Sequence, residues 1–231
     1  MLGGGIERGT VTVISGASGV GKSTTATQLS VAAAERGERA VSYLFEESRK
    51  TFVRRSESVG MPVRRLEADG SLELREVEAL SVSPDEFAAE VREQVEVEGA
   101  SVVVIDGISG YRMSIRGDDE DLVRELHALC RYLRGMGVTT VLLDDVPAVT
   151  GDFEPTSERI SYLADAILFL RYLEYRGEVR KAAGVLKKRS SDFERALREF
   201  EITANGLALG APLTDLRGVL TGTPEWPDDD G

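Results

Sequence analysis

The stretch TVTVISGASGVGKSTTATQLSVAAAERG, residues 10–37, decides the fold that we expect for this chain. It opens with an apolar, β-branched run, TVTVIS (10–15), which is typical of a buried strand. A glycine-rich turn follows, and then an alanine-rich stretch that predicts a helix ending at Gly37. A strand, a glycine turn and a helix in this order form the structural context of a phosphate-binding loop.

The turn itself, GASGVGKST (16–24), has the spacing GxxxxGK[ST]. Glycines let backbone N–H groups curl around phosphates, Lys22 reaches the β- and γ-phosphates, and the Ser23 hydroxyl binds Mg²⁺. The alternative, a glycine turn with an incidental lysine, is disfavoured because a strand leads in and a helix leads out. We therefore expect a nucleotide to be held by Gly16, Ala17, Ser18, Gly19, Val20, Gly21, Lys22 and Ser23.

The same alternation of strand and helix continues along the chain. Apolar runs predict strands at 40–45, 101–106 and 138–145, and amphipathic stretches predict helices at 48–60, 83–99 and 118–137. Ser83, Pro84 and Glu86 have the spacing of a capped helix start, and residues 71–80 are irregular with a short edge strand. Strands separated by such helices predict an α/β fold with a mostly parallel central sheet flanked by helices.

The pattern changes after about residue 164. Four β-rich runs joined by turns predict a C-terminal antiparallel extension of the sheet, at 166–175, 178–189, 197–203 and 206–210. No repeat or linker divides the chain. We expect one domain over residues 1–222 and an acidic disordered tail over 223–231.

The charge balance limits the partners that we expect. Forty acidic against 28 basic residues give a net charge of -12, which repels nucleic acid and anionic lipid. The Lys-poor balance is typical of a high-salt cytoplasm, where screening weakens that repulsion. No apolar run approaches the roughly 20 residues of a membrane span, and the N-terminus is unlike a signal peptide, so a cytoplasmic protein is expected. The single Cys130 and single His127 predict neither a disulfide nor a zinc site.

Asp106 ends the apolar run SVVVID. The carboxyl end of such a strand should lie beside the phosphate loop, where a carboxylate can hold the water shell of Mg²⁺. The alternative is an aspartate that caps a turn, because Gly107 follows directly. Beside a strong phosphate loop, we favour Ser23 and Asp106 as the Mg²⁺ site.

Glu46 and Glu47 stand side by side in LFEESRK (44–50), where the second predicted strand ends. A site that hydrolyses nucleotides needs a group at this edge of the sheet to orient or deprotonate the attacking water. Because neighbouring strand residues point to opposite faces, one carboxylate should approach the γ-phosphate while the other braces it or pairs with a base. The alternative is a solvated helix start in an acidic chain.

Lys187 and Arg189, in GVLKKRSSDF, are two apart on a predicted strand and so share a face, while Lys188 points away. Two cations on one edge often bind an anion. Because the phosphate loop already has Lys22, this pair could complete the site of a neighbouring subunit, as an arginine finger does. The alternative is a solvated basic edge strand that discourages aggregation.

Four segments together resemble a KaiC-type ATPase domain of the RecA superfamily of P-loop NTPases. They are LGGGIERGTVTVISGASGVGKST (2–24), YLFEES (43–48), VVVIDGISG (102–110) and the block from YLADAILFL to LREFEIT (162–203). The glutamate pair and the last block do not belong to phosphate-loop proteins in general. The resemblance covers nearly the whole chain, from Leu2 to about Gly206.

The resemblance implies a RecA-like core that assembles into a homo-oligomeric ring, commonly a hexamer, with Mg-ATP between subunits. It implies that Gly21, Lys22, Ser23 and Thr24 bind the triphosphate and Mg²⁺. It also implies that Glu46 and Glu47 are the catalytic pair, with Lys22, and that Asp106 is the second acidic element. Lys187 and Arg189 would reach the neighbour's nucleotide.

The chain departs from the pattern of the family that it resembles in two places. Family domains usually have a strand and a helix before LGGGI, so the start at Met1 suggests a truncated reading frame, half of a two-domain protein, or a minimal version. The adjacent Ser and Thr phosphorylation sites are replaced by Ser161 and Tyr162, with Thr156 upstream. Ser161 could accept a phosphoryl group in a weak autokinase reaction, but the residues favour an ordinary turn hydroxyl.

Three functions remain open on the sequence. The first is Mg-dependent ATP hydrolysis at the interfaces of a KaiC-like ring, with a regulatory or signalling role. The second is a nucleotide-dependent scaffold that recruits an unknown signalling protein with little hydrolysis. The third is a RecA-like DNA-binding ATPase, which the acidic loops around 114–122 and 144–159 disfavour.

Overall fold

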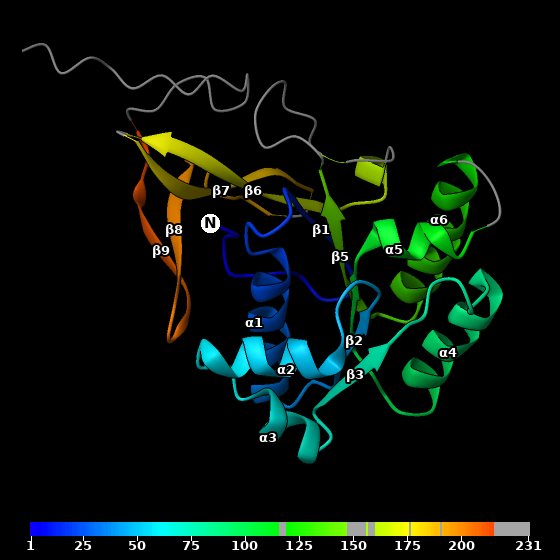
Figure 1. The fold of residues 1–231 in the computed structure, drawn as a ribbon. Coiled ribbons are helices and arrows are strands. Elements are labelled where there is room, and N and C mark those ends of the chain that lie inside the picture. Colours follow the sequence, from blue (N-terminus) through cyan, green and yellow to red (C-terminus); the bar gives the residue numbers. More distant parts are fainter. Residues whose placement is uncertain (116–118, 147–155, 157–159, 176, 190, 215–231) are drawn as a thin grey trace, which may run out of the picture.

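The computed structural model describes residues 1–115, 119–146, 156, 160–175, 177–189 and 191–214 (Figure 1). Its strands form one sheet in the order β3-β2-β4-β5-β1-β6-β7-β8-β9. The six strands from β3 to β6 are parallel, and β7, β8 and β9 continue the sheet antiparallel. The strands are β1 (Val11–Gly16), β2 (Ala40–Leu44), β3 (Leu72–Glu76), β4 (Val102–Asp106), β5 (Thr139–Asp145), β6 (Ala166–Tyr175), β7 (Glu178–Lys188), β8 (Arg198–Thr203) and β9 (Gly206–Pro212).

Helices cover both faces of the parallel part of the sheet, which gives three layers (Figure 1). The helices are α1 (Lys22–Glu35), α2 (Arg49–Ser58), α3 (Val63–Ala68), α4 (Pro84–Glu96), α5 (Ile108–Met113) and α6 (Asp119–Gly135), with a 3-10 turn at Ile160–Tyr162. One apolar core lies between the sheet and α1 to α3, and the other between the sheet and α4 to α6. Val13 and Ile14, adjacent on β1, point into different cores, as strand alternation requires.

The α/β fold with a mostly parallel core and a C-terminal antiparallel extension is confirmed. Each predicted strand and long helix is present, with ends that differ by only a few residues. The predicted capping box is also present: Ser83 N–H donates to Glu86 Oε2 at 2.8 Å, and Glu86 N–H donates back to the Ser83 hydroxyl. The sequence did not predict α3 and α5, because six residues are too few to show a helical period. The predicted tail, 223–231, lies outside the described residues.

The strand order decides which strand ends lie beside the phosphate loop. β5 lies directly next to β1, and β4 is the neighbour after that. The side chain that ends β5, Asp145, is therefore closer to the loop than we expected from the sequence, where only Asp106 was placed there. No helix in the described part of the chain is both long and apolar enough to cross a membrane.

Candidate functional site

The phosphate loop connects the end of β1 to the start of α1, as the motif predicts. All six residues of β1 are buried, so the strand holds Gly16 in the middle of the sheet. α1 begins at Lys22, after Gly21, and no side chain caps its first N–H groups. Uncapped N–H groups at a helix start carry partial positive charge and bind anions well, which suits a phosphate.

Lys22 is buried, with 6% of its side chain exposed. Its ammonium group donates to the carbonyl oxygens of Gly16 at 2.9 Å and Ala17 at 3.0 Å, and to Asp145 Oδ1 at 2.6 Å. An ammonium group has three N–H donors, so all three are engaged inside the protein. The pair with Asp145 compensates the cost of burying the lysine charge.

Ser23 and Asp106 lie together at the start of α1 and the end of β4. The Ser23 hydroxyl donates to Asp106 Oδ1 at 3.1 Å. Burial raises the pKa of Asp106 to about 6, against the opposing effects of the Ser23 hydrogen bond and Arg55, while Glu47 and Glu46 add to the rise. Mg²⁺ prefers hard oxygen ligands and keeps several waters, so a hydroxyl and a carboxylate at this spacing fit a Mg²⁺ ion that is completed by water and phosphate.

Glu46 lies just past β2, against the loop that follows β4. The residue as a whole is exposed, but its carboxylate rests on Gly107: a Cβ there would come within 2.9 Å of Glu46 Cγ. Desolvation and then the Asp145 charge raise the pKa of Glu46, opposed by the Gly110 N–H and by Lys22. In the described part of the chain, no Lys or Arg forms an ion pair with Glu46.

Glu47, the next residue, forms an ion pair with Arg55. Its carboxylate accepts from Arg55 Nε at 3.2 Å and from Arg55 Nη2 at 2.8 Å, the forked geometry of a strong arginine pair. Arg55 Nη1 also donates to the Thr24 hydroxyl at 3.3 Å. In the described structure, the two glutamates have different surroundings, as expected: one is ion-paired, and the other has no such partner. The reason is not strand alternation, because β2 ends at Leu44 and both glutamates lie in the bend that follows it.

The site carries an excess of negative charge. Four carboxylates are linked by their charges: Glu46 is in electrostatic reach of Asp145, and Asp106 of Glu46 and Glu47. Among the described residues, only two cations pair with this group, Lys22 with Asp145 and Arg55 with Glu47. This imbalance favours a divalent cation bound with the nucleotide. In the part of the chain that the structure describes, no three His, Cys, Asp or Glu side chains form a metal-binding group. A protein site for Mg²⁺ here is therefore limited to ligands such as Ser23 and Asp106.

Lys187 and Arg189 lie at one end of the strands, and the phosphate loop of their own chain lies at the other end. Lys187 Nζ donates to the backbone carbonyl of Ser161 at 3.1 Å, and Arg189 pairs with Asp165 at 3.6 Å. Asp165 in turn accepts from the N–H of Val11, at the start of β1. The phosphate loop follows the other end of that strand, about 17 Å away at roughly 3.3 Å per residue.

The two cations share one face, and Lys188 points away, as predicted. Lys188 donates to the carbonyl oxygens of Leu2 and Gly5, which ties down the N-terminal glycine turn. Desolvation and the neighbouring Arg189 charge lower the pKa of Lys187, against the opposing effect of Asp165. Repulsion between two close cations would be relieved by a bound anion.

Three further side chains from the sequence analysis lie away from the phosphate loop. Ser161 is in the 3-10 turn beside Lys187, and Thr156 lies outside any helix or strand. His127 packs with its ring centroid 6.0 Å from that of Tyr162. None of them contacts the phosphate loop in the described structure. The acidic loops that disfavour DNA binding fall largely on residues 116–118 and 147–155, which lie outside the described residues.

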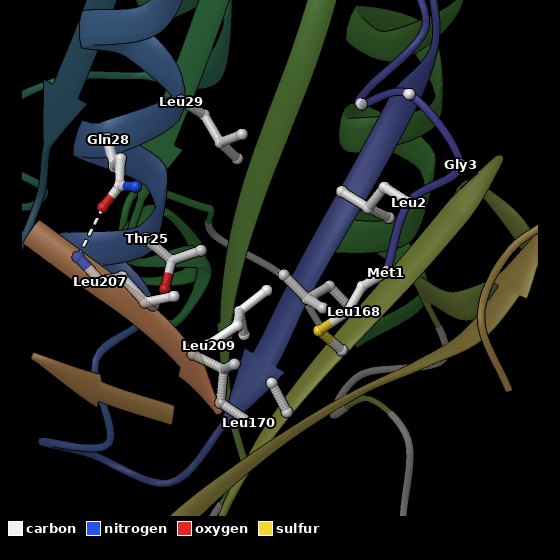
Figure 2. A pocket seen from close by; sticks show the side chains of 13 residues that line it. Met1, Leu2, Gly3, Thr25, Gln28, Leu29, Leu168, Leu170, Leu207 and Leu209 are labelled. Carbon is white, nitrogen blue, oxygen red and sulfur yellow. Dashed lines mark hydrogen bonds between the residues drawn. The ribbon is translucent and has the colours of Figure 1, made fainter. Parts of the chain in front are cut away.

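A cavity of about 320 Å³ lies between α1, residues 1–5 and strands β6, β7 and β9 (Figure 2). Its lining is mainly leucine side chains, among them Leu29, Leu168 and Leu170. Gln28 points toward β9, where its Oε1 accepts from the N–H of Leu207 at 2.6 Å (Figure 2). No residue of the phosphate loop from 16 to 22 lines this cavity, so it is separate from the phosphate site.

Two residues of the site, Asp145 and Arg55, were not predicted from the sequence. Asp145 was read only as the end of a strand, because its role depends on β5 lying next to β1. Arg55 is one of three arginines on a polar helix. Its spacing from Glu47, eight residues across a strand end and a helix start, gave no signal that the two would meet.

Comparison with known proteins agrees with this geometry. The family model described as "ATPase: KaiC" matches residues 1–213. The chain is 27% identical over 227 residues to the circadian clock protein KaiC3 of Synechocystis sp., covering 98% of this chain and 44% of that protein. It is also 27% identical to the circadian clock oscillator protein KaiC of Thermostichus vulcanus, over 97% of this chain and 43% of the relative. The chain spans less than half the length of these relatives, and it belongs to the KaiC family of ATPases.

Proposed function

We propose that this chain binds Mg-ATP on its phosphate loop and hydrolyses it at interfaces between copies of the chain. The observation that carries the proposal is the convergence of Lys22, Ser23, Asp106 and Glu46 at one edge of the sheet, with Glu46 not ion-paired in the described structure. The loop and the N–H groups of α1 would hold the phosphates. Ser23 and Asp106 would hold Mg²⁺, which supplies charge compensation for the transferred phosphoryl group.

Glu46 is the residue that we assign to the attacking water. Its raised pKa makes it a stronger base than an ordinary carboxylate, and it lies within electrostatic reach of Lys22. Glu46 would accept a proton from the water as the water oxygen bonds to the γ-phosphorus, while the bond from that phosphorus to the bridging oxygen breaks and the oxygen leaves with ADP. Glu47 is unsuited to this step, because the arginine fork occupies both of its oxygens.

The interface between copies enters the proposal through Lys187 and Arg189. Within one chain these cations lie at the start of β1 and the phosphate loop lies at its end, so they cannot serve their own nucleotide. A neighbour packed head to tail would bring them to the phosphates, and a closed repeat of that contact is a ring. The family resemblance favours a hexamer and a regulatory or signalling role.

Phosphate release is the experiment that tests hydrolysis. Purified protein with Mg-ATP at high salt should release inorganic phosphate, and Glu46→Gln should slow the release by about 10²-fold or more while leaving ADP binding intact. Glu57→Gln, which changes an exposed glutamate on α2, is the matched control and should keep full activity. Full phosphate release by Glu46→Gln would refute the assignment of the base. Nucleotide-dependent assembly without any release would favour the scaffold function instead.

A further inference from the structure

Arg55 has the contacts of a residue built into the phosphate site. It projects from α2 with 28% of its side chain exposed, and its guanidinium stacks on the ring of Phe52, 5.0 Å from the centroid. Phe52 is buried, so this contact fixes the arginine stem. Glu47 fixes the guanidinium from one side through two hydrogen bonds, and Thr24 accepts a third on the phosphate-loop side.

The Arg55 guanidinium has more N–H donors than its contacts in the described structure use. Of its five N–H groups, one on each nitrogen is engaged, by Glu47 and Thr24. The second N–H on Nη1 and the second on Nη2 have no partner in the described part of the chain. A guanidinium with two available N–H groups matches the spacing of two phosphate oxygens, which is why arginine binds phosphate as a fork.

The position of Arg55 also suits a phosphate ligand. Thr24 follows Lys22 and Ser23 directly, so its hydroxyl lies at the start of α1, where the phosphates of a nucleotide would contact free N–H groups. The charge of Arg55 reaches Asp106 as well, the carboxylate beside Ser23. Arg55 is therefore close to the helix start through Thr24, to the glutamate pair through Glu47, and to the expected Mg²⁺ ligand Asp106.

We propose that Arg55 is a second phosphate-binding cation of this site, supplied by the same chain as Lys22, and that it binds the phosphates of a nucleoside di- or triphosphate from beside Thr24. The proposal rests on nucleotide binding at the phosphate loop but not on hydrolysis. Glu47 holds the guanidinium in place with one edge, and the other edge faces the ligand. Arg55 and Lys22 approach the phosphates from different elements, α2 and the phosphate loop.

Binding of ADP, measured by titration calorimetry with Mg²⁺ at fixed ionic strength, tests the proposal without any turnover. Arg55→Gln should weaken ADP binding by about tenfold or more, as expected for loss of a charge-assisted hydrogen bond. Arg55→Lys, which keeps the charge but loses the fork, should fall between this variant and wild type. Arg54→Gln, which changes the adjacent exposed arginine, is the matched control and should bind within about twofold of wild type.

Two additional readouts keep the test decisive. Arg55→Gln leaves Glu47 without its partner, so Glu47→Gln and the double variant Glu47→Gln/Arg55→Gln are compared as well. The double variant should bind ADP about tenfold more weakly than Glu47→Gln alone. Inorganic pyrophosphate, used as a competitor, should lose affinity in parallel if Arg55 contacts phosphate rather than the base.

The outcomes separate this proposal from the proposed function. Unchanged ADP affinity in Arg55→Gln and in the double variant, relative to their parents, would overturn the role of Arg55 even if wild type hydrolyses ATP. Conversely, a wild type that binds ADP through Arg55 but releases no phosphate from ATP would refute hydrolysis and would support the role of Arg55 in phosphate binding. A wild type that binds no ADP at all would overturn both.

Discussion

The Nζ atom of Lys22 lies 2.6 Å from Oδ1 of Asp145, and the carbonyl oxygens of Gly16 and Ala17 take its two other hydrogens. The phosphate-loop lysine is therefore saturated before any nucleotide arrives. A phosphate oxygen has to replace at least one of these acceptors, and the carboxylate, which also repels the phosphate, is the one most easily displaced by a negatively charged ligand.

The first prediction is that Asp145→Asn tightens nucleotide binding. The amide still accepts a hydrogen bond from Lys22 but no longer competes as an anion, so the affinity for ADP should rise by about three- to tenfold. Titration calorimetry measures this directly. Asp121→Asn, on the surface of α6, removes a carboxylate from the exposed ion pair with Arg124 and should leave the affinity unchanged. Weaker binding by Asp145→Asn would show that the aspartate supports the nucleotide rather than competes with it.

The two glutamates should differ sharply in their effects on hydrolysis. Glu46→Gln removes the proposed base and should lower kcat by about 10² to 10⁴, with little change in KM. Glu47→Gln keeps the base but loosens Arg55, so its effect should be smaller and should appear mainly in KM. Steady-state phosphate release over a range of ATP concentrations separates the two parameters. Equal losses of kcat in both variants would contradict the division of roles that the Arg55 fork implies.

The pH dependence of activity should reflect the environment of Glu46. The base works only when it is deprotonated, so kcat/KM should fall as the pH drops through its raised pKa. Asp145→Asn removes one cause of that rise, and the acidic limb of the pH profile should therefore move to lower pH. A pH profile of phosphate release for wild type and variant measures the shift. If the limb stays in place, Asp145 does not act on the group that titrates.

The stability of the Mg-free protein should depend on Asp106. Burial raises its pKa from 3.8 in the unfolded chain to about 6 in the folded protein. The folded state therefore binds this proton more tightly than the unfolded state does. Protonated Asp106 adds to the free energy of unfolding below pH 4, and this contribution is lost as the pH rises through 6. Asp106→Asn should be more stable than wild type at pH 7.5 by about 1 to 3 kcal/mol, and the gap should shrink at pH 4.5. Urea unfolding at both values checks this, and a pH-independent gap would contradict it.

If two neighbouring chains together form each site, two inactive variants should restore activity to each other when they are mixed. Glu46→Gln removes the base from one chain's site, whereas Lys187→Gln/Arg189→Gln removes the cations that we expect to serve the neighbour's site. In mixed rings, some interfaces combine an intact base with intact cations, so mixing should restore part of the phosphate release. Each variant alone should stay inactive and should unfold at a temperature close to wild type. No rescue in rings shown to be mixed would mean that each chain hydrolyses ATP by itself.

Much of the fold could be predicted from local patterns in the sequence. The loop from Gly16 to Ser23 has a spacing that only one chemistry explains well, and the buried runs around it are long enough to identify as strands. The capped helix at Ser83 and the antiparallel strands after residue 164 were likewise visible. Each of these features depends on residues close together in the chain, and so the sequence alone was sufficient to find them.

The contacts between elements were decided by the tertiary structure. Asp145 meets Lys22 because β5 inserts between β4 and β1, an order that strand and helix patterns do not specify. Arg55 meets Glu47 and Thr24 because the start of α1 lies beside α2. The sequence by itself determined that a phosphate loop and a glutamate pair exist at strand ends. Which carboxylate is ion-paired and which is not depends on packing between distant segments, and only the folded chain brings those segments together.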